Sequence, residues 1–292
     1  MAWDGVSGKR VLVTGATDGI GLAACEALAR LGAELAIVAR NEAKAERATA
    51  RIVAAGGTAT VVDVLMADLA SQASVRHLAA EVLERYPRLD ALVNNAGAIY
   101  SRRQLSPDGI ELTWALNHLA PFLLTSLLLE RLQASGPARI VTTSSDAHKG
   151  ASIPFDDLNA ERGYRGFRRY GQTKLANILF TSELARRIGD ADVTANCFHP
   201  GLVTTGFNRN NGALMRFGMT VVRPFSRSPD QGADTLVWLL DSPEVQDLSG
   251  LYFVDRKVAV PSAAAQDPAT ARRLWEVSAA QTHLDHRAGS SD

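Results

Sequence analysis

The sequence predicts an α/β protein, built as a doubly wound parallel sheet with helices on both faces. Three observations support this prediction. Short β-branched runs alternate with longer segments whose apolar residues recur at helical spacing. A glycine-rich turn joins the first run to the first helical segment. The 292 residues, 46% of them hydrophobic, contain no repeat, linker or charge block, so we expect one domain over 1–292 with a frayed tail at 288–292.

Each βα unit can be located from its apolar pattern. The strands are expected at 10–14, 34–39, 58–64, 89–93, 139–144, 193–198 and 250–254. The helices are expected at 20–31, 41–55, 71–85, 111–131, 170–187 and 230–240. Ser71 is in position to cap the third helix, and Gly32 lies where a left-handed residue would end the first.

Two stretches, 146–169 and 206–228, interrupt the alternation, and long loops in a compact domain often cover a site. We therefore expect both to border the substrate. Apolar residues in the second, including Phe207, Met215 and Phe217, suit a lid over an apolar substrate, although a core helix or a subunit contact would use the same residues. We interpret the arginines near the first stretch as solvated charges: Arg102, Arg103, Arg165, Arg168 and Arg169.

Composition narrows the class of function. Lys and Arg number 31, as do Asp and Glu, so no net charge favours nucleic acid or an anionic membrane as a partner. Cys25 and Cys197 lack the spacing of a metal or redox pair, which favours buried thiols and predicts no metal site. The first ten residues contain no apolar signal segment, and no run of 18 apolar residues occurs. We expect a cytoplasmic protein without a membrane span.

The turn Thr14–Gly21 (TGATDGIG) lies between the first strand and the first helix. A dinucleotide pyrophosphate needs free N–H groups at a helix N-terminus and close backbone approach, which Gly15, Gly19 and Gly21 allow. A tight turn that binds nothing is the alternative. The position between strand and helix favours a dinucleotide site, with these contact residues: Gly15, Thr17, Asp18, Gly19, Ile20 and Gly21.

The spacing TGxxxGxG resembles that of the short-chain dehydrogenase/reductase family, and the resemblance extends over nearly the whole chain. It differs from the GxGxxG of other Rossmann enzymes and from the TGxxGxxG of sugar-nucleotide epimerases. The resemblance implies a Rossmann fold and a nicotinamide cofactor. It also implies contacts after later strands: Asp68 and Leu69 with adenine, Asn94, Ala96 and Gly97 beside the cofactor, and Pro200, Gly201, Val203 and Thr205 with the nicotinamide.

Two of these positions, and one residue beside them, have further readings. Asp68 could equally cap a helix, and Asn94 is expected to be largely structural, near the adenosine. His199, just before Pro200, is interpreted as a packing residue.

The residues at the end of the second strand indicate which nicotinamide is used. An acidic residue there would bind the ribose 2′-hydroxyl and repel a 2′-phosphate, but this chain has Ala39 followed by Arg40. A guanidinium binds phosphate bidentately, so Arg40 favours NADP(H), with NAD(H) as the weaker candidate. A solvated arginine is the alternative reading. Asp18 is a departure, because many NADP-preferring relatives carry Arg or Lys in the turn.

Tyr170 and Lys174 lie four residues apart, which places them on one face of a helix. A phenol ordinarily titrates near ~10, and a neighbouring ammonium together with the nicotinamide charge would lower that pKa. Tyr170 could then act as general acid or base, although YxxxK alone also occurs on surface helices. The resemblance implies that Ser145, rather than Ser144, binds the substrate oxygen. It also implies that Asn117 holds a water that links Lys174 to solvent.

The 25 positions between Ser145 and Tyr170 resemble the retinol-dehydrogenase-like branch, as do Ser144–His148 and Lys174–Phe180. Relatives in this branch act on lipophilic alcohols, aldehydes and ketones, and similar sequences include bacterial ketoreductases. We therefore expect hydride transfer between NADP(H) and an apolar carbonyl or alcohol. An epimerase or dehydratase, or a non-catalytic NADP(H) sensor, remains as an alternative. The apolar helices at 111 and 170 would suit a homodimer or burial within one chain.

Overall fold

The computed structural model describes residues 2–189, 191–203 and 227–284. Thr205, nearly all of the 206–228 stretch and the predicted frayed tail at 288–292 lie outside the described residues. The expectations for these segments therefore stay predictions.

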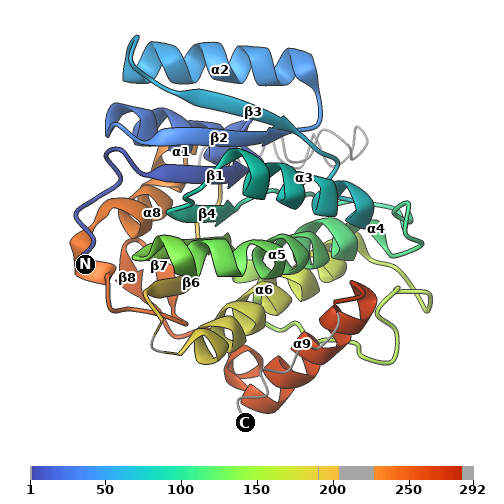
Figure 1. The fold of residues 1–292 in the computed structure, drawn as a ribbon. Coiled ribbons are helices and arrows are strands. Elements are labelled where there is room, and N and C mark those ends of the chain that lie inside the picture. The colour runs from blue at the N-terminus through green and yellow to red at the C-terminus, as the bar shows by residue number, and fades with distance from the viewer. Residues whose placement is uncertain (1, 190, 204–226, 285–292) are drawn as a thin grey trace.

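The described strands form one sheet in the order β3-β2-β1-β4-β5-β6-β7-β8 (Figure 1). Neighbouring strands pair in parallel from β3 to β7, and β8 pairs antiparallel with β7. The strand bounds are β1 Arg10–Thr14, β2 Glu34–Ala39, β3 Val62–Met66, β4 Ala91–Asn94, β5 Ala138–Thr143, β6 Val193–His199, β7 Tyr252–Val254 and β8 Lys257–Val258. The order reverses between β1 and β4, which is where ligands bind in open α/β sheets, beyond the carboxyl ends of the strands.

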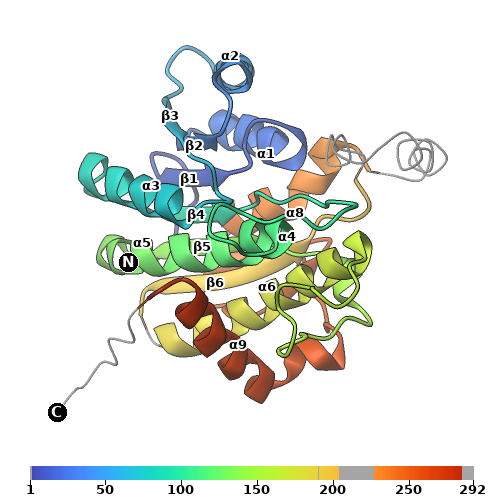
Figure 2. The same ribbon diagram turned by 90° about the vertical axis from the view of Figure 1, so that its right-hand side faces the viewer.

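Helices cover both faces of the sheet (Figure 2). The α-helices are α1 Gly19–Arg30, α2 Glu42–Gly56, α3 Gln72–Arg85, α4 Leu112–Trp114, α5 Ala120–Ser135, α6 Gly166–Ile188, α8 Pro229–Asp241 and α9 Pro268–Gln281. Shorter turns are η1 Ala115–Leu119, η2 Asp146–His148, η5 Pro243–Val245 and η6 Ala263–Gln266. This arrangement confirms the predicted α/β class.

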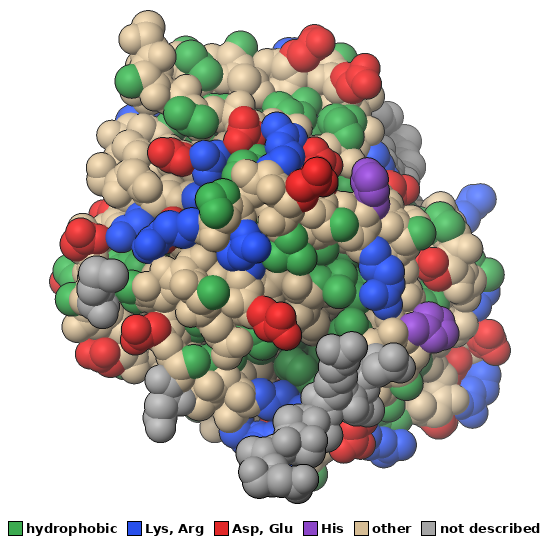
Figure 3. All heavy atoms as spheres, viewed as in Figure 1, with side chains coloured by type: hydrophobic (Ala, Val, Ile, Leu, Met, Phe, Trp, Pro, Cys, Tyr) green, Lys and Arg blue, Asp and Glu red, His purple; other side chains and the backbone are tan. Residues whose placement is uncertain are grey.

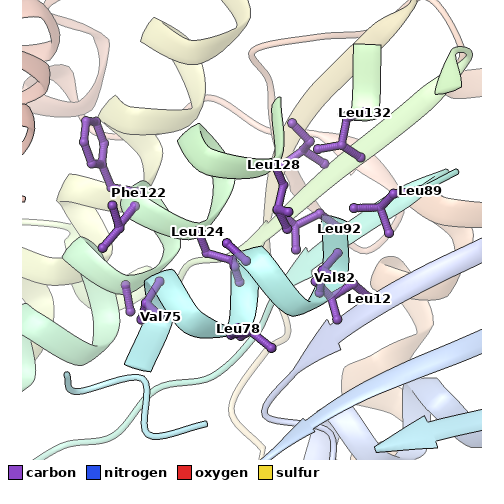
Figure 4. Close-up of a cluster of buried hydrophobic side chains, with 14 of the residues drawn as sticks. Leu12, Val75, Leu78, Val82, Leu89, Leu92, Phe122, Leu124, Leu128 and Leu132 are labelled. Carbon is purple, nitrogen blue, oxygen red and sulfur yellow. The ribbon is translucent and has the colours of Figure 1, made fainter. Parts of the chain in front are cut away.

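Clusters of buried hydrophobic residues lie on both faces of the sheet. On one face, α3 and α5 pack against β1 and β4, and Leu78, Leu124, Leu128 and Leu92 belong to one buried cluster (Figure 4). On the other, side chains from α1, α2 and α8 pack together, for example Leu28, Ile52 and Leu236. The strands read as continuous apolar runs because both faces are buried.

The predicted caps of the first and third helices are present. Gly32 has φ of 83°, the left-handed conformation that ends α1. The hydroxyl of Ser71 accepts a hydrogen bond from the backbone N–H of Ser74 and caps α3.

The third strand was placed too early, at 58–64. The chain instead turns after α2, where the N–H of Thr60 donates to the carbonyl of Gly57, and β3 begins at Val62 opposite Leu35. The threonines at 58 and 60 have strand propensity, but here they lie in the turn that follows α2. Because α2 ends only at Gly56, the strand begins later than predicted.

The fold contains two further elements that the apolar pattern did not predict. One is the two-residue strand β8, too short to show any alternation. The other is α9, which begins with Asp267 as N-cap and Pro268 in its first turn. Helix α6 also begins four residues earlier than expected, at Gly166, where a Cβ atom would stand 2.2 Å from the carbonyl oxygen of Tyr100.

Helix α9 packs across α6 and α5. The ring of Trp275 stacks on Phe180 at 5.9 Å and meets Phe122 edge-on at 4.9 Å between centroids. Burial within one chain therefore accounts for these apolar residues of the helices at 111 and 170. Among the described residues, one helical stretch, Leu112–Ser135, is long and apolar enough to cross a bilayer, and 72% of its most apolar window is buried in the protein.

Basic and acidic side chains are interspersed on the face shown in Figure 3. No extended basic surface is visible on that face, in keeping with the balanced composition.

Candidate active site

The glycine turn packs tightly against the segment that follows β4. Gly15 and Gly19 have φ of 67° and 55°, which favour glycine. A Cβ on Gly15 would stand 2.8 Å from the Cα of Ala96, and one on Gly21 would stand 2.2 Å from the carbonyl oxygen of Gly15. The carboxylate of Asp18 accepts a hydrogen bond from the N–H of Gly19 at 2.8 Å and caps α1. The turn thus brings backbone to the N-terminus of α1 without side chains in the way.

Thr14 and Asn95 join the glycine turn to the neighbouring strands. The Thr14 hydroxyl donates to the carbonyl of Val93 at 3.0 Å and accepts from the N–H of Asn95 at 3.0 Å. The Asn95 amide donates to the carbonyl of Gly15 at 3.2 Å and accepts from the hydroxyl of Thr143 at 3.1 Å. Asn95 therefore links the cofactor turn to the end of β5, a role that the sequence did not single out.

The remaining residues predicted to contact a cofactor follow other strands at the same edge of the sheet. The buried amide of Asn94 donates to the Thr125 hydroxyl on α5 at 2.9 Å, in keeping with a structural role. The carboxylate of Asp68 accepts from the N–H of Ala70 at 3.0 Å, in the turn before α3, and the cap of that helix is Ser71 rather than Asp68. Arg40 is exposed after β2, and the Tyr100 hydroxyl is its hydrogen-bond partner. These positions lie together because parallel strands share a carboxyl edge.

The predicted nicotinamide contacts follow β6. Gly201 has φ of 82°, and a Cβ there would meet the Arg227 side chain at 2.6 Å. Val203 pairs with Arg227 in an isolated parallel bridge, which fixes the described residues on either side of 204–226. Pro200 comes directly after the strand, and His199 accepts from the N–H of Asp146 at 3.3 Å, a packing and hydrogen-bonding role.

The four residues predicted as a catalytic tetrad converge beyond β4 and β5. The Ser145 and Tyr170 side chains are hydrogen-bonded to each other. The Lys174 ammonium donates to the carbonyl of Thr143 at 2.9 Å and lies 5.4 Å from the centroid of the Tyr170 ring. Ser144, the less favoured serine, donates to the carbonyl of Lys174 at 2.8 Å and so serves α6 instead.

Asn117 lies in the five-residue π turn η1, between α4 and α5. Its buried amide accepts from the N–H of Ala98 at 2.8 Å and donates to the hydroxyl of Thr173 at 3.2 Å. That hydroxyl donates to the carbonyl of Tyr170 at 2.7 Å. Asn117 thus connects the segment after β4 to the start of α6, and π turns are frequent at functional sites. A water relay through Asn117 stays a prediction.

Gly97 leaves room for this meeting of side chains. A Cβ on Gly97 would lie 3.3 Å from the amide oxygen of Asn117 and 3.8 Å from the Lys174 nitrogen. A side chain at this small residue after β4 would therefore press on the Asn117 amide.

The ionisation of the two titratable residues is set mainly by burial. Burial lowers the pKa of Lys174 from 10.5 to about 8, so the side chain is still mostly an ammonium at neutral pH. Burial raises the pKa of Tyr170 to about 12, and its hydrogen bond with Ser145 acts in the opposite direction. The chain's own groups do not produce the lowered phenol pKa that the sequence led us to expect, because desolvation of the phenolate outweighs the neighbouring groups.

One arginine near the first excursion was misread. Arg169 is not a solvated charge, since its side chain is 1% exposed and its Nε donates to Glu111 at 2.6 Å. The sequence around Arg169 does not indicate its burial, because its acidic partner, Glu111, lies on a distant segment. Arg102, Arg165 and Arg168 are exposed as expected, and Arg103 is partly buried.

His148, whose role the sequence did not reveal, supports the serine. Its Nδ1 donates to the carbonyl of Ser145, with 2.7 Å between the two atoms, and its Nε2 accepts from the N–H of Ser262 at 3.1 Å. This assignment follows because a carbonyl can only accept and a backbone N–H can only donate. His148 therefore fixes the backbone of Ser145 against the segment before α9.

The glycine turn at the switch point and the serine, tyrosine and lysine beyond β5 define a class: a dinucleotide-binding α/β oxidoreductase. Residues 9–215 match the family model for short chain dehydrogenases, and the chain belongs to that family.

Similar proteins place the chain in the retinol-dehydrogenase-like branch. It is 42% identical to mouse retinol dehydrogenase 14 over 283 residues, covering 93% of this chain and 85% of the relative. It is also 42% identical over 277 residues to a provisionally assigned daunorubicin C-13 ketoreductase from a Streptomyces species, covering 94% and 93% of the two chains.

Solved structures agree with the fold and with the family. An uncharacterized protein of Mycobacterium paratuberculosis matches with a TM-score of 0.77 and 31% identity, over 97% of this chain and 98% of that one. A short chain dehydrogenase from Burkholderia cenocepacia, solved in complex with NADP, matches with a TM-score of 0.68 and 28% identity, over 90% and 99% of the two chains.

Proposed function

We propose that this protein uses NADP(H) to interconvert a lipophilic ketone or aldehyde with its alcohol, with Tyr170 as general acid and base. The observation that carries the proposal is the meeting of Ser145, Tyr170 and Lys174 beside the glycine turn. A tyrosine, a hydrogen-bonding hydroxyl and a buried cation together form an acid–base unit.

The residues of the glycine turn suit a dinucleotide. The turn at Gly15 and Gly21 has no room for Cβ atoms, and the N-terminus of α1 attracts anions, so these residues would hold the pyrophosphate. Arg40 is exposed after β2 and would hold the 2′-phosphate of NADP(H). When bound, the nicotinamide supplies or accepts the hydride.

The proton is handled by three side chains. The hydroxyl of Ser145 would hold the substrate oxygen next to the Tyr170 hydroxyl, its present partner. With a pKa of about 12, Tyr170 is protonated at neutral pH, the form that donates a proton in carbonyl reduction. The Lys174 ammonium, held by the Thr143 carbonyl near the ring, would stabilise the phenolate that results.

An exposed aromatic side chain supports an apolar substrate. Phe167 lies one helical turn before Tyr170, is 66% exposed, and has its ring centroid 6.5 Å from that of the tyrosine. Such exposure of a large apolar side chain beside an acid–base residue is what contact with an apolar ligand would use. Two similar proteins are named for reactions of an alcohol and of a ketone, as a retinol dehydrogenase and a daunorubicin C-13 ketoreductase.

The test is to follow nicotinamide absorbance with NADPH and then NADH against a panel of lipophilic aldehydes and ketones. Oxidation of NADPH that depends on the carbonyl, with NADH slower, is the expected result. Faster turnover with NADH would overturn the cofactor assignment. Tight NADPH binding without turnover of any carbonyl would favour a sensor over an enzyme.

A further inference from the structure

A fully buried ion pair joins Arg169, the residue before Tyr170, to Glu111. Nε of Arg169 donates to a carboxylate oxygen of Glu111 at 2.6 Å, and the two side chains are 1% and 0% exposed. The same guanidinium donates to the side-chain oxygen of Gln172 at 3.3 Å and to the carbonyl of Leu158. One guanidinium therefore joins α6, the segment before α4 and the excursion at 146–169.

The acidic partner holds the same elements from the other side. The carboxylate of Glu111 accepts from the N–H groups of Thr113 and Trp114, both at 2.9 Å, and so caps the helical stretch that leads to Asn117. Its backbone N–H donates to the side-chain oxygen of Asn159 at 3.0 Å. Glu111 is thereby linked to both ends of the stretch 158–169.

Stability alone gives no reason for charges at this place. Removing two ions from water costs several kcal/mol each, and well-packed apolar pairs are often as stable as buried ion pairs. The pair instead fixes the relative positions of the segments that it joins. The planar guanidinium has donors at fixed angles, and each donor meets a different segment. Arg169 also lies over the ring of Trp114, with 4.7 Å from the guanidinium carbon to the ring centroid.

We propose that the Glu111–Arg169 pair is a clamp that positions Tyr170 relative to Asn117 and holds the stretch 158–169 against the substrate site. Both members are positioning residues, since they act through Tyr170 and through the excursion. The inference rests on the proposed function for its catalytic consequence, whereas the clamping of 158–169 can be measured without turnover.

The test compares single and double variants of the pair. Arg169→Met or Glu111→Gln alone leaves a buried charge without its partner, and we expect Tm to fall by about 10 °C. The double variant Glu111→Gln/Arg169→Met removes both charges, keeps a capping oxygen at 111, and should recover most of that loss. A displacement of about 1 Å at a reacting group can lower turnover about 100-fold. We therefore expect kcat to stay lowered by that order in the double variant, with KM for NADPH unchanged.

A matched control is the exposed pair of Asp234 and Arg256, whose side chains are 46% and 53% exposed. The variant Asp234→Asn/Arg256→Met removes the same charges at the surface and should leave both Tm and kcat close to those of the natural protein. Hydrogen–deuterium exchange of peptides within 158–165 gives the readout that needs no substrate. We expect faster exchange there in the double variant of the clamp, despite its recovered Tm.

The outcomes separate the clamp from the proposed function. Recovery of kcat together with Tm in the double variant would overturn the clamp, because the pair would then be structural only. Lowered kcat with unchanged exchange would overturn it as well, since 158–165 would not be held by the pair. If the natural protein reduces no carbonyl, the proposed function fails. In that case faster exchange still supports the clamp, and unchanged exchange overturns it.

Discussion

Replacement of Lys174 by Met should stabilise the protein at neutral pH while it abolishes turnover. Burial lowers the pKa of this lysine from 10.5 to about 8. At about 1.4 kcal/mol for each pH unit, the buried ammonium costs about 3 kcal/mol of folding free energy below pH 8. Met fills similar space without charge, but it cannot make the charged hydrogen bond to the Thr143 carbonyl, and that loss costs about 1.5 kcal/mol.

The expected net gain for Lys174→Met is therefore about 1.5 kcal/mol, or a Tm higher by a few degrees at pH 7. The sign of the pH dependence follows from proton binding. Between pH 8 and 10.5 the unfolded chain binds more protons at Lys174 than the folded chain, so the natural protein gains stability as pH rises. The difference between Lys174→Met and the natural protein should shrink over that window.

Thermal unfolding by circular dichroism at pH 7 and at pH 9.5 measures both effects. Lys44→Met, at an exposed position on α2, is the control and should change Tm by little at either pH. A Lys174→Met variant less stable than the natural protein at pH 7, or a difference that is independent of pH, would refute the reasoning from burial.

Three further results are expected. Arg40→Ala should weaken NADPH binding by about 10- to 100-fold and leave NADH binding unaffected, because charged hydrogen bonds contribute about 1.5–3 kcal/mol. Titration of each cofactor into this variant and into the control variant Arg47→Ala, on α2, measures the effect. Equal losses of affinity for both cofactors would contradict the prediction. Gly21→Ala should abolish NADPH binding, since its Cβ would meet the Gly15 carbonyl at 2.2 Å, whereas Gly57→Ala, with open space and φ of 89°, should lower only Tm. The kcat of carbonyl reduction should fall as pH rises through about 8, where Lys174 loses its proton; a profile flat to pH 10 would contradict this.

Most of the sheet could be predicted because buried parallel strands are continuous apolar runs. The runs at 10–14 and 34–39 coincide with β1 and β2 at both ends. The strand near 58 was misplaced because threonines suit both a strand and a turn, and only pairing with β2 decides between them. Helix α9 does carry local signals, because Asp267 and Pro268 are residues that mark a helix start.

The site residues that form a short sequence pattern could be predicted, as in the glycine turn and the pair Tyr170 and Lys174. Contacts between segments distant in the sequence could not be predicted. Asn95 bridges the glycine turn and β5, and Arg169 finds Glu111 58 residues away. The raised pKa of Tyr170 also depends on burial, which the sequence does not show.

The central claim is that Tyr170 is the proton donor in carbonyl reduction, and Tyr170→Phe tests it most directly. The variant Tyr86→Phe is the control, because it removes a hydroxyl that bonds Asp63 and has no part in the proposed site. Rates of NADPH oxidation with a carbonyl from the panel, and Kd for NADPH, should be measured for both variants and the natural protein. We predict kcat lower by about 10²- to 10⁴-fold for Tyr170→Phe alone, with Kd unchanged. Equal rates from Tyr170→Phe and the natural protein would contradict the account.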